Sequence, residues 1–164
     1  MKIATILGAR PQFVKAALLS RKLRGIHKEI IIHTGQHYSD NMSKIFFEEM
    51  GIPMPDYNLG IGSGTHGYQI SNMIRRIEEL LIKEKPDLVL LYGDTNSTLG
   101  GAIAARKLNL RIAHVEAGLR SYDKTIPEET NRVVSDYVSD ILFCPTKTAV
   151  KNLKKENIKG KIYF

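Results

Sequence analysis

Short runs of apolar and β-branched residues alternate with stretches of helical periodicity along almost the whole chain. The runs have the length of strands and no polar alternation, so they predict strands that are covered on both faces. Helices between such strands are the connections that parallel strands need. The sequence therefore predicts an α/β protein with a doubly wound, mostly parallel, Rossmann-like sheet. The expected strands are 3–7, 29–33, 88–92, 111–115, 141–143 and 161–164, and the expected helices are 11–23, 39–50, 69–84, 96–108, 127–138 and 146–156.

Length and composition describe an ordinary soluble domain. The chain has 164 residues, within the roughly 100–200 residues typical of one domain. Its single cysteine, Cys144, excludes an internal disulfide and any zinc site built from several cysteines, and we expect it to be inert packing. No apolar run approaches the roughly 20 residues of a membrane span, and the first strand is too short for the core of a signal peptide. We therefore expect a soluble, cytoplasmic protein without membrane contact.

The formal net charge of +7 is not evidence for a nucleic-acid partner. Residues 1–30 carry +6 and residues 146–164 carry +5, which leaves −4 for the stretch between them. No nucleic-acid-binding motif or aromatic stacking cluster accompanies the basic ends. We interpret these ends as solvated helix faces and expect no nucleic-acid partner.

Ligands of open parallel sheets bind at the carboxyl ends of the strands, so the residues at those ends are the candidates for function. After the first strand, a glycine turn leads from Gly8 into a helix. Free backbone N–H groups, the helix dipole and the guanidinium of Arg10 would suit a phosphate there. The turn matches neither the GxGxxG pattern nor a Walker loop. A plain helix start with an exposed arginine is the alternative.

Three carboxylates can reach the same edge of the sheet. Asp94 and Glu116 each follow an expected strand, and Glu128 opens an expected helix. Helix capping and the helix dipole are alternative explanations for Asp94 and Glu128. A carboxylate at the mouth of a strand, such as Glu116, is costly to bury unless it is paired. Carboxylates beside Arg10 suit proton transfer next to a phosphate leaving group, without a redox cofactor.

Two further segments follow the strands on the other side of the sheet. His33 and His37 flank the end of the second strand and lack a third well-spaced ligand, so we predict no metal site. The glycine-rich stretch 60–67 has the composition of a binding loop.

At these same segments the chain resembles the non-hydrolysing UDP-N-acetylglucosamine 2-epimerases. The resemblance runs over all 164 residues, and its most specific part is the pair of motifs in the middle of the chain. The matching motifs are GARP at 8–11, QH at 36–37, GDT at 93–95, HVEAGLRS at 114–121 and PEETNR at 127–132.

The resemblance implies a fold and an activity. The family has two Rossmann-like domains with the active site between them, like the two-domain sugar-nucleotide glycosyltransferases. Residues 1–164 would be the first domain, a second UDP-binding domain would complete the enzyme, and the assembly would be a homodimer. The activity would be interconversion of UDP-N-acetylglucosamine and UDP-N-acetylmannosamine for cell-surface polysaccharides. UDP would be eliminated and added back, with no cofactor, neither NAD nor metal.

The resemblance also assigns residues. Asp94, Glu116 and Glu128 would be the catalytic acids and bases. The substrate-binding residues would be Arg10, which faces the diphosphate, and Lys15, Gln36, His37 and Arg120. Ala9 and Gln12 replace a threonine and a glutamate common in the family's first turn. The segment after His37 and the loop around Gly62 lack basic residues that many bacterial members use for substrate activation. The alternatives are a non-catalytic half that needs a second domain and a hydrolysing epimerase.

Overall fold

A computed structural model describes residues 1–35, 51 and 53–164. The expected helix 39–50 and the candidate residues Gln36 and His37 lie outside this part of the chain. The described strands form one seven-stranded, all-parallel sheet in the order β3-β2-β1-β4-β5-β6-β7. They are β1 (Lys2–Leu7), β2 (Lys28–His33), β3 (Tyr57–Asn58), β4 (Leu88–Tyr92), β5 (Ile112–Val115), β6 (Ile141–Phe143) and β7 (Lys161–Tyr163). The helices are α1 (Arg10–Arg24), α3 (His66–Glu84), α4 (Asn96–Lys107), α5 (Pro127–Val138) and α6 (Lys147–Lys155).

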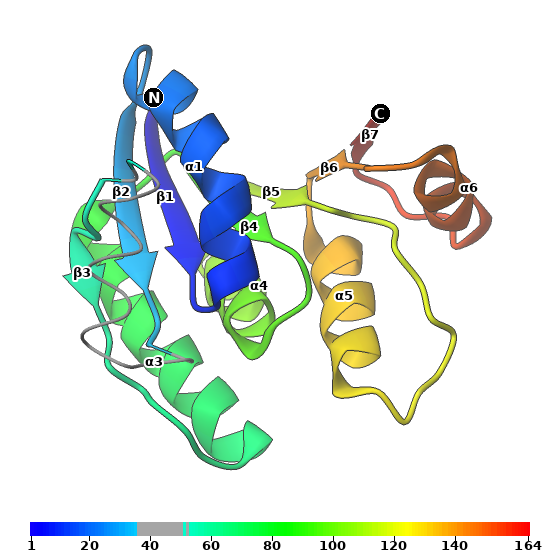
Figure 1. Ribbon diagram of the computed structural model, residues 1–164, viewed down its shortest axis with the longest axis horizontal. Coiled ribbons are helices and arrows are strands. Elements are labelled where there is room, and N and C mark those ends of the chain that lie inside the picture. The colour runs from blue at the N-terminus through cyan, green and yellow to red at the C-terminus, as the bar shows by residue number, and fades with distance from the viewer. Residues whose placement is uncertain (36–50, 52) are drawn as a thin grey trace.

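Helices cover both faces of the sheet, as the apolar strands predicted (Figure 1). Side chains alternate along each strand, so Ile3 and Leu7 pack under α1 while Ala4 and Ile6 pack on the opposite face. On that opposite face α3, α4 and α5 lie side by side. Leu142 of β6 packs with α6 near the far edge of the sheet. The doubly wound parallel architecture is therefore confirmed.

The element boundaries agree with the sequence to within three residues, and one strand was missed. β3 has only two residues, too few to show a hydrophobic pattern. Helix α3 begins at His66, three residues before its expected start, because the Thr65 hydroxyl accepts a hydrogen bond from the N–H of Tyr68. The end of the glycine-rich stretch thus belongs to a helix.

The structure bears on two expectations, the one about membrane spans and the one about Cys144. Within residues 1–35, 51 and 53–164, no helix is long and apolar enough to span a membrane. Cys144 is buried, and this burial raises the pKa of its thiol to about 11. The thiolate is therefore scarce at neutral pH, as inert packing requires.

The strand order reverses between β1 and β4, because the chain moves outward to β2 and β3 before it returns beside β1. At such a switch point the loops leave the strands in opposite directions and open a crevice at their carboxyl ends. The turn after β1 and the turn after β4 meet there. Their close approach requires glycine at position 8, since a Cβ on Gly8 would lie 1.9 Å from Ser97 Oγ and 2.3 Å from Thr34 Oγ1.

Candidate active site

The turn after β1 differs from the open phosphate cradle that the sequence suggested. The side-chain oxygen of Gln12 accepts hydrogen bonds from the N–H groups of Gly8 (2.7 Å) and Ala9 (3.0 Å). Its Nε2 donates to the carbonyl oxygen of Tyr92 at 2.6 Å. The expectation of free N–H groups at Gly8 and Ala9 is therefore wrong, because a buried Gln12 fills the turn and ties it to β4. Arg10 remains exposed at the first position of α1.

Asp94 follows β4 and is held from α5. Arg132 Nη2 donates to Asp94 Oδ2 at 2.5 Å, and Asn131 Nδ2 donates to the Asp94 backbone oxygen at 2.9 Å. The Asp94 side chain is one-third exposed, so it combines a fixed position with an accessible oxygen. A fixed carboxylate that still reaches solvent is the arrangement that proton transfer to a ligand needs.

Glu116 lies at the end of β5 in an unusual backbone conformation. Its φ is +71°, a region that residues with a Cβ adopt at an energetic cost and that clusters at functional sites. Lys15 Nζ on α1 donates to Glu116 Oε2 at 2.5 Å. A Cβ on Gly93 would lie 3.3 Å from that same oxygen, so the carboxylate lies over the turn that carries Asp94. The structure therefore brings Lys15 and Glu116 to the turn that precedes Asp94.

Glu128 and Glu129 are neighbours with different surroundings. Glu128 is exposed in the first turn of α5. It precedes Arg132 by four residues, so the two start from the same side of the helix. Glu129 is buried and accepts hydrogen bonds from the N–H groups of Ser121 and Tyr122. Glu129 therefore organises the loop before α5, and Glu128 is the carboxylate that a ligand can reach.

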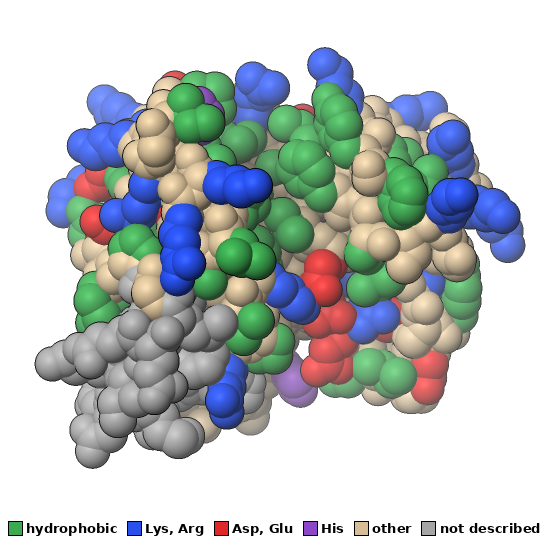
Figure 2. Space-filling model, turned by 45° about the horizontal axis from the view of Figure 1, so that its top comes forward, with side chains coloured by type: hydrophobic (Ala, Val, Ile, Leu, Met, Phe, Trp, Pro, Cys, Tyr) green, Lys and Arg blue, Asp and Glu red, His purple; other side chains and the backbone are tan. Residues whose placement is uncertain are grey.

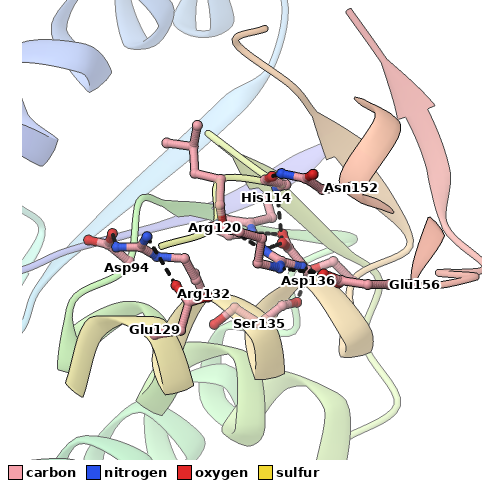
Figure 3. Close-up of polar contacts among 12 residues, drawn as sticks. Asp94, His114, Arg120, Glu129, Arg132, Ser135, Asp136, Asn152 and Glu156 are labelled. Atoms are coloured by element: carbon pink, nitrogen blue, oxygen red, sulfur yellow. Dashed lines mark hydrogen bonds and ion pairs between the residues drawn. The ribbon is translucent and has the colours of Figure 1, made fainter. Parts of the chain in front are cut away.

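Arg120 is buried instead of facing a ligand. Its side chain is 1% exposed, and four of its five N–H donors are used within the chain. The acceptors are Asp136, Glu156 and the Leu119 carbonyl oxygen. Figure 3 shows this network beside the Asp94–Arg132 pair. The structure thus places Arg120 in the support of the site, apart from Asp94 and Glu116.

Several polar residues behind the site were not predicted from the sequence. Asn96 accepts a hydrogen bond from Asn131 (3.2 Å) and donates to Gln69 (2.9 Å). Its Nδ2 also lies 3.1 Å from Nδ1 of His66, at the start of α3. These contacts join α3, α4 and α5 under Asp94. The sequence did not indicate these contacts, because apolar periodicity predicts the helices but not which polar side chains of different helices meet.

The resulting site combines charges of both signs. Lys15 contacts Glu116 and Arg132 contacts Asp94, and Figure 2 shows acidic and basic side chains side by side in the lower middle of one face. Asp94 and Glu116 each have a cationic partner. Such a site suits an anionic ligand on which a proton is moved.

A doubly wound parallel sheet with fixed carboxylates at its switch point defines an open-sheet α/β protein whose ligand site lies at the carboxyl edge. A family model described as UDP-N-acetylglucosamine 2-epimerase matches residues 21–164. The chain belongs to this family. The resemblance inferred from the HVEAGLRS and PEETNR motifs is thereby confirmed.

Relatives and solved structures agree with this assignment. A UDP-N-acetylglucosamine 2-epimerase homolog of Methanococcus maripaludis is 63% identical over 99% of this chain and 46% of its own length. A UDP-2,3-diacetamido-2,3-dideoxy-D-glucuronate 2-epimerase of Pseudomonas aeruginosa is 58% identical over 98% of this chain and 46% of its own. The crystal structure of Methanocaldococcus jannaschii UDP-GlcNAc 2-epimerase in complex with UDP-GlcNAc and UDP superposes with a TM-score of 0.95 at 53% identity, covering 99% of this chain and 46% of that one. The chain spans about half the length of the relatives it matches.

Proposed function

We propose that this chain is the carboxylate-bearing half of an enzyme that interconverts UDP-N-acetylglucosamine and UDP-N-acetylmannosamine. The observation that supports it most is the meeting of Glu116, Lys15 and the Asp94 turn at the switch point of the sheet. The names of relatives and the substrate complex of the M. jannaschii structure support the substrate class. A second, UDP-binding domain and a homodimer remain parts of the same proposal.

The proposed reaction has two stages that balance in protons and bonds. A carboxylate removes the proton from C-2 of the sugar, the C-1–oxygen bond to UDP breaks, and a C-1–C-2 double bond forms. UDP then adds back at C-1 while an acid delivers a proton to the other face of C-2. No carbonyl group acidifies the C-2 proton, so the base must act while the departing diphosphate is stabilised.

The described residues suit these tasks. Glu116 and Asp94 lie on adjoining turns, and Glu128 is exposed on α5 within one helical turn of the Arg132 that holds Asp94. We assign acid and base roles to these three carboxylates as a group. Arg10 and Lys15, on the first two turns of α1, are the cations that suit the diphosphate, and Lys15 also contacts Glu116.

Proton NMR in heavy water tests this proposal. The protein is incubated with UDP-N-acetylglucosamine, and the loss of the C-2 hydrogen and the appearance of mannosamine signals are followed. We expect deuterium at C-2 of both sugars, and a decrease of at least about 100-fold in its incorporation for Glu116→Gln with the fold intact. Normal incorporation in Glu116→Gln would refute the assignment of this carboxylate.

The same experiment separates the alternatives. Release of UDP with free N-acetylmannosamine would identify a hydrolysing epimerase. A folded chain without exchange, which becomes active when a second sugar-nucleotide-binding domain is supplied, would identify a half that needs its partner. The P. aeruginosa relative favours a second substrate, UDP-2,3-diacetamido-2,3-dideoxy-D-glucuronate. Faster C-2 exchange with that compound than with UDP-N-acetylglucosamine would identify it as the preferred substrate. The proposed elimination and re-addition of UDP would be unchanged.

A further inference from the structure

Asp136 on α5 is a buried carboxylate that lies outside the group of candidate catalytic carboxylates. Its side chain is fully buried, and both of its oxygens are used. Oδ1 lies 2.8 Å from Nδ1 of His114, while Oδ2 accepts from the N–H of Gly118 at 2.9 Å and from Arg120 Nη1 at 2.7 Å. One carboxylate thus collects three groups from the strand β5 and from the segment after it (Figure 3).

The imidazole of His114 carries this connection to the turn after β4. His114 is fully buried, and its Nε2 lies 2.6 Å from the Gly93 carbonyl oxygen. A carbonyl oxygen only accepts, so Nε2 carries the hydrogen. With Nδ1 held by Asp136, the ring cannot rotate without breaking both contacts. The carbonyl of the residue immediately before Asp94 is therefore tied to α5 through His114.

The second connection fixes the segment that follows Glu116. Gly118 has a φ of +80°, and a Cβ there would lie 2.4 Å from the Ala149 carbonyl oxygen, so the segment fits closely against α6. The carboxylate of Asp136 holds the Gly118 N–H on one side, and Arg120 bridges from Asp136 to Glu156 on the other. Because Glu116 has an unfavourable backbone conformation, it needs this external restraint to keep its carboxylate over Gly93.

We propose that Asp136, acting through His114 and Gly118, is the positioning residue that sets Asp94 and Glu116 relative to one another. This inference rests on the proposed function, because the two carboxylates are assigned there. Neither Asp136 nor His114 reaches solvent, so neither contacts a substrate. Their role is to fix two turns that come from different strands in one geometry, as preorganised acid–base chemistry requires.

Asp140 provides a control with similar partners. It lies at the opposite end of β5, where its Oδ2 accepts from the Ile112 N–H at 2.8 Å and from Arg106 Nη2 at 2.8 Å. Asp140 thus shares two kinds of contact with Asp136, an arginine and a backbone N–H, without any link to Asp94 or Glu116. Asp140 is 39% exposed and Asp136 is fully buried, so the two variants are compared by the isotope effect, which a loss of folded protein does not change.

The test uses the full-length protein that contains this chain, with UDP-N-acetylglucosamine carrying hydrogen or deuterium at C-2. In Asp136→Asn we expect kcat to fall by about 10- to 100-fold while KM stays within about threefold. The deuterium isotope effect on kcat should increase, because a displaced base slows proton transfer relative to product release. Asp140→Asn should keep the isotope effect and kcat of the wild type.

The isotope effect decides between positioning and general structural damage. Loss of folded protein lowers kcat but leaves the isotope effect of the remaining molecules unchanged, so an unchanged isotope effect in Asp136→Asn would overturn the inference. If Asp136→Asn does not fold, His114→Ala removes the link to Gly93 and should give the same increase. An unchanged isotope effect in a folded His114→Ala variant would likewise overturn it.

A second measurement keeps the inference separate from the proposed function. Wild-type protein without C-2 exchange on any substrate would contradict the proposed function. Amide hydrogen exchange then tests the positioning alone, since Asp136→Asn should speed exchange at residues 93–94 and 116–118 by about tenfold or more, while Asp140→Asn should not. Equal exchange at these amides in both variants would contradict the positioning role itself.

Discussion

Lys15 on α1 and Glu116 after β5 are 101 residues apart in the sequence, and their charged groups lie 2.5 Å apart, from Nζ to Oε2. The pair spans the switch point of the sheet and connects the first helix to the carboxyl end of β5. Its members are 39% and 24% exposed, so the contact is open to a ligand on one side. The position of Glu116 thus depends on an element at the other end of the chain.

Replacing Lys15 tests whether this pair serves activity or stability. Ion pairs this exposed contribute about 0–1 kcal/mol, so Lys15→Met should change the free energy of unfolding by less than about 1 kcal/mol. Removal of the only cation within hydrogen-bonding distance of Glu116 among the described residues should lower turnover by about 10- to 100-fold. Steady-state kinetics and urea unfolding check both expectations. Lys22→Met, on the exposed side of the same helix, is the control, and wild-type turnover in Lys15→Met would contradict the assignment.

The neighbours Glu128 and Glu129 should respond to the same substitution in opposite ways. Glu129→Gln weakens hydrogen bonds to a buried charge and should lower the free energy of unfolding by about 2 kcal/mol. Glu128→Gln should leave stability within about 0.5 kcal/mol and lower turnover by about 100-fold or more. Thermal unfolding and the C-2 exchange assay measure the two effects. A large loss of stability in Glu128→Gln and a large loss of turnover in Glu129→Gln would contradict the roles assigned to the two residues.

The acid stability of the protein should depend in part on Glu129. Burial alone raises the pKa of Glu129, but hydrogen bonds from Ser121 and Tyr122 and the charge of Arg132 hold it below its ordinary value. The ionised form is therefore favoured in the folded state. Its contribution is complete above the unfolded pKa of about 4.3 and is lost as the pH falls through the folded pKa. Between pH 5 and 3, Glu129→Gln should lose less stability than the wild type.

A second pH-dependent contribution comes from His33, which is 1% exposed and stacks on Phe13 at 5.0 Å between ring centroids. Burial lowers the pKa of His33, more than the neighbouring Asn58 side chain raises it, so the folded state favours the neutral ring. This stabilisation is complete above the unfolded pKa of about 6.5 and declines as the pH falls below it. Urea unfolding at pH 7.5, 6.5 and 5.5 should show a shallower decline for His33→Gln. Parallel curves for the two proteins would count against this account.

Gly8 should be intolerant of a side chain. An alanine Cβ there would meet the Ser97 and Thr34 hydroxyls, which lie 2.7 Å from one another. Gly8→Ala should therefore displace the turns and lower the free energy of unfolding by about 1–3 kcal/mol. The displacement should also move Gln12 out of its position. Gly67 is the matched control, because nothing lies within 4 Å of its Cβ position and it is in a helix. Gly67→Ala should be neutral or stabilise by up to about 1 kcal/mol, and equal thermal unfolding of the two variants would refute this distinction.

Most of the fold could be predicted, because burial on both faces leaves a continuous apolar run in each parallel strand. The bounds of β4, β6 and α5 agree with the predicted ranges to the residue. β3 was not predicted, since a two-residue strand depends on its pairing with β2 and on nothing in its own pattern. The rule that ligands bind where strands end was enough to select Asp94 and Glu116.

The sequence by itself determined the order of strands and helices, the edge at which polar residues collect and the family to which the motifs belong. Only the tertiary structure decided that Gln12 fills the first turn, that Arg120 is buried, and that Glu128 faces outward while Glu129 faces inward. The physical reason is that the periodicity of apolar residues along a chain indicates which positions are buried. Which partner it meets is set by residues far away in sequence, such as Asp136 for His114 and Lys15 for Glu116.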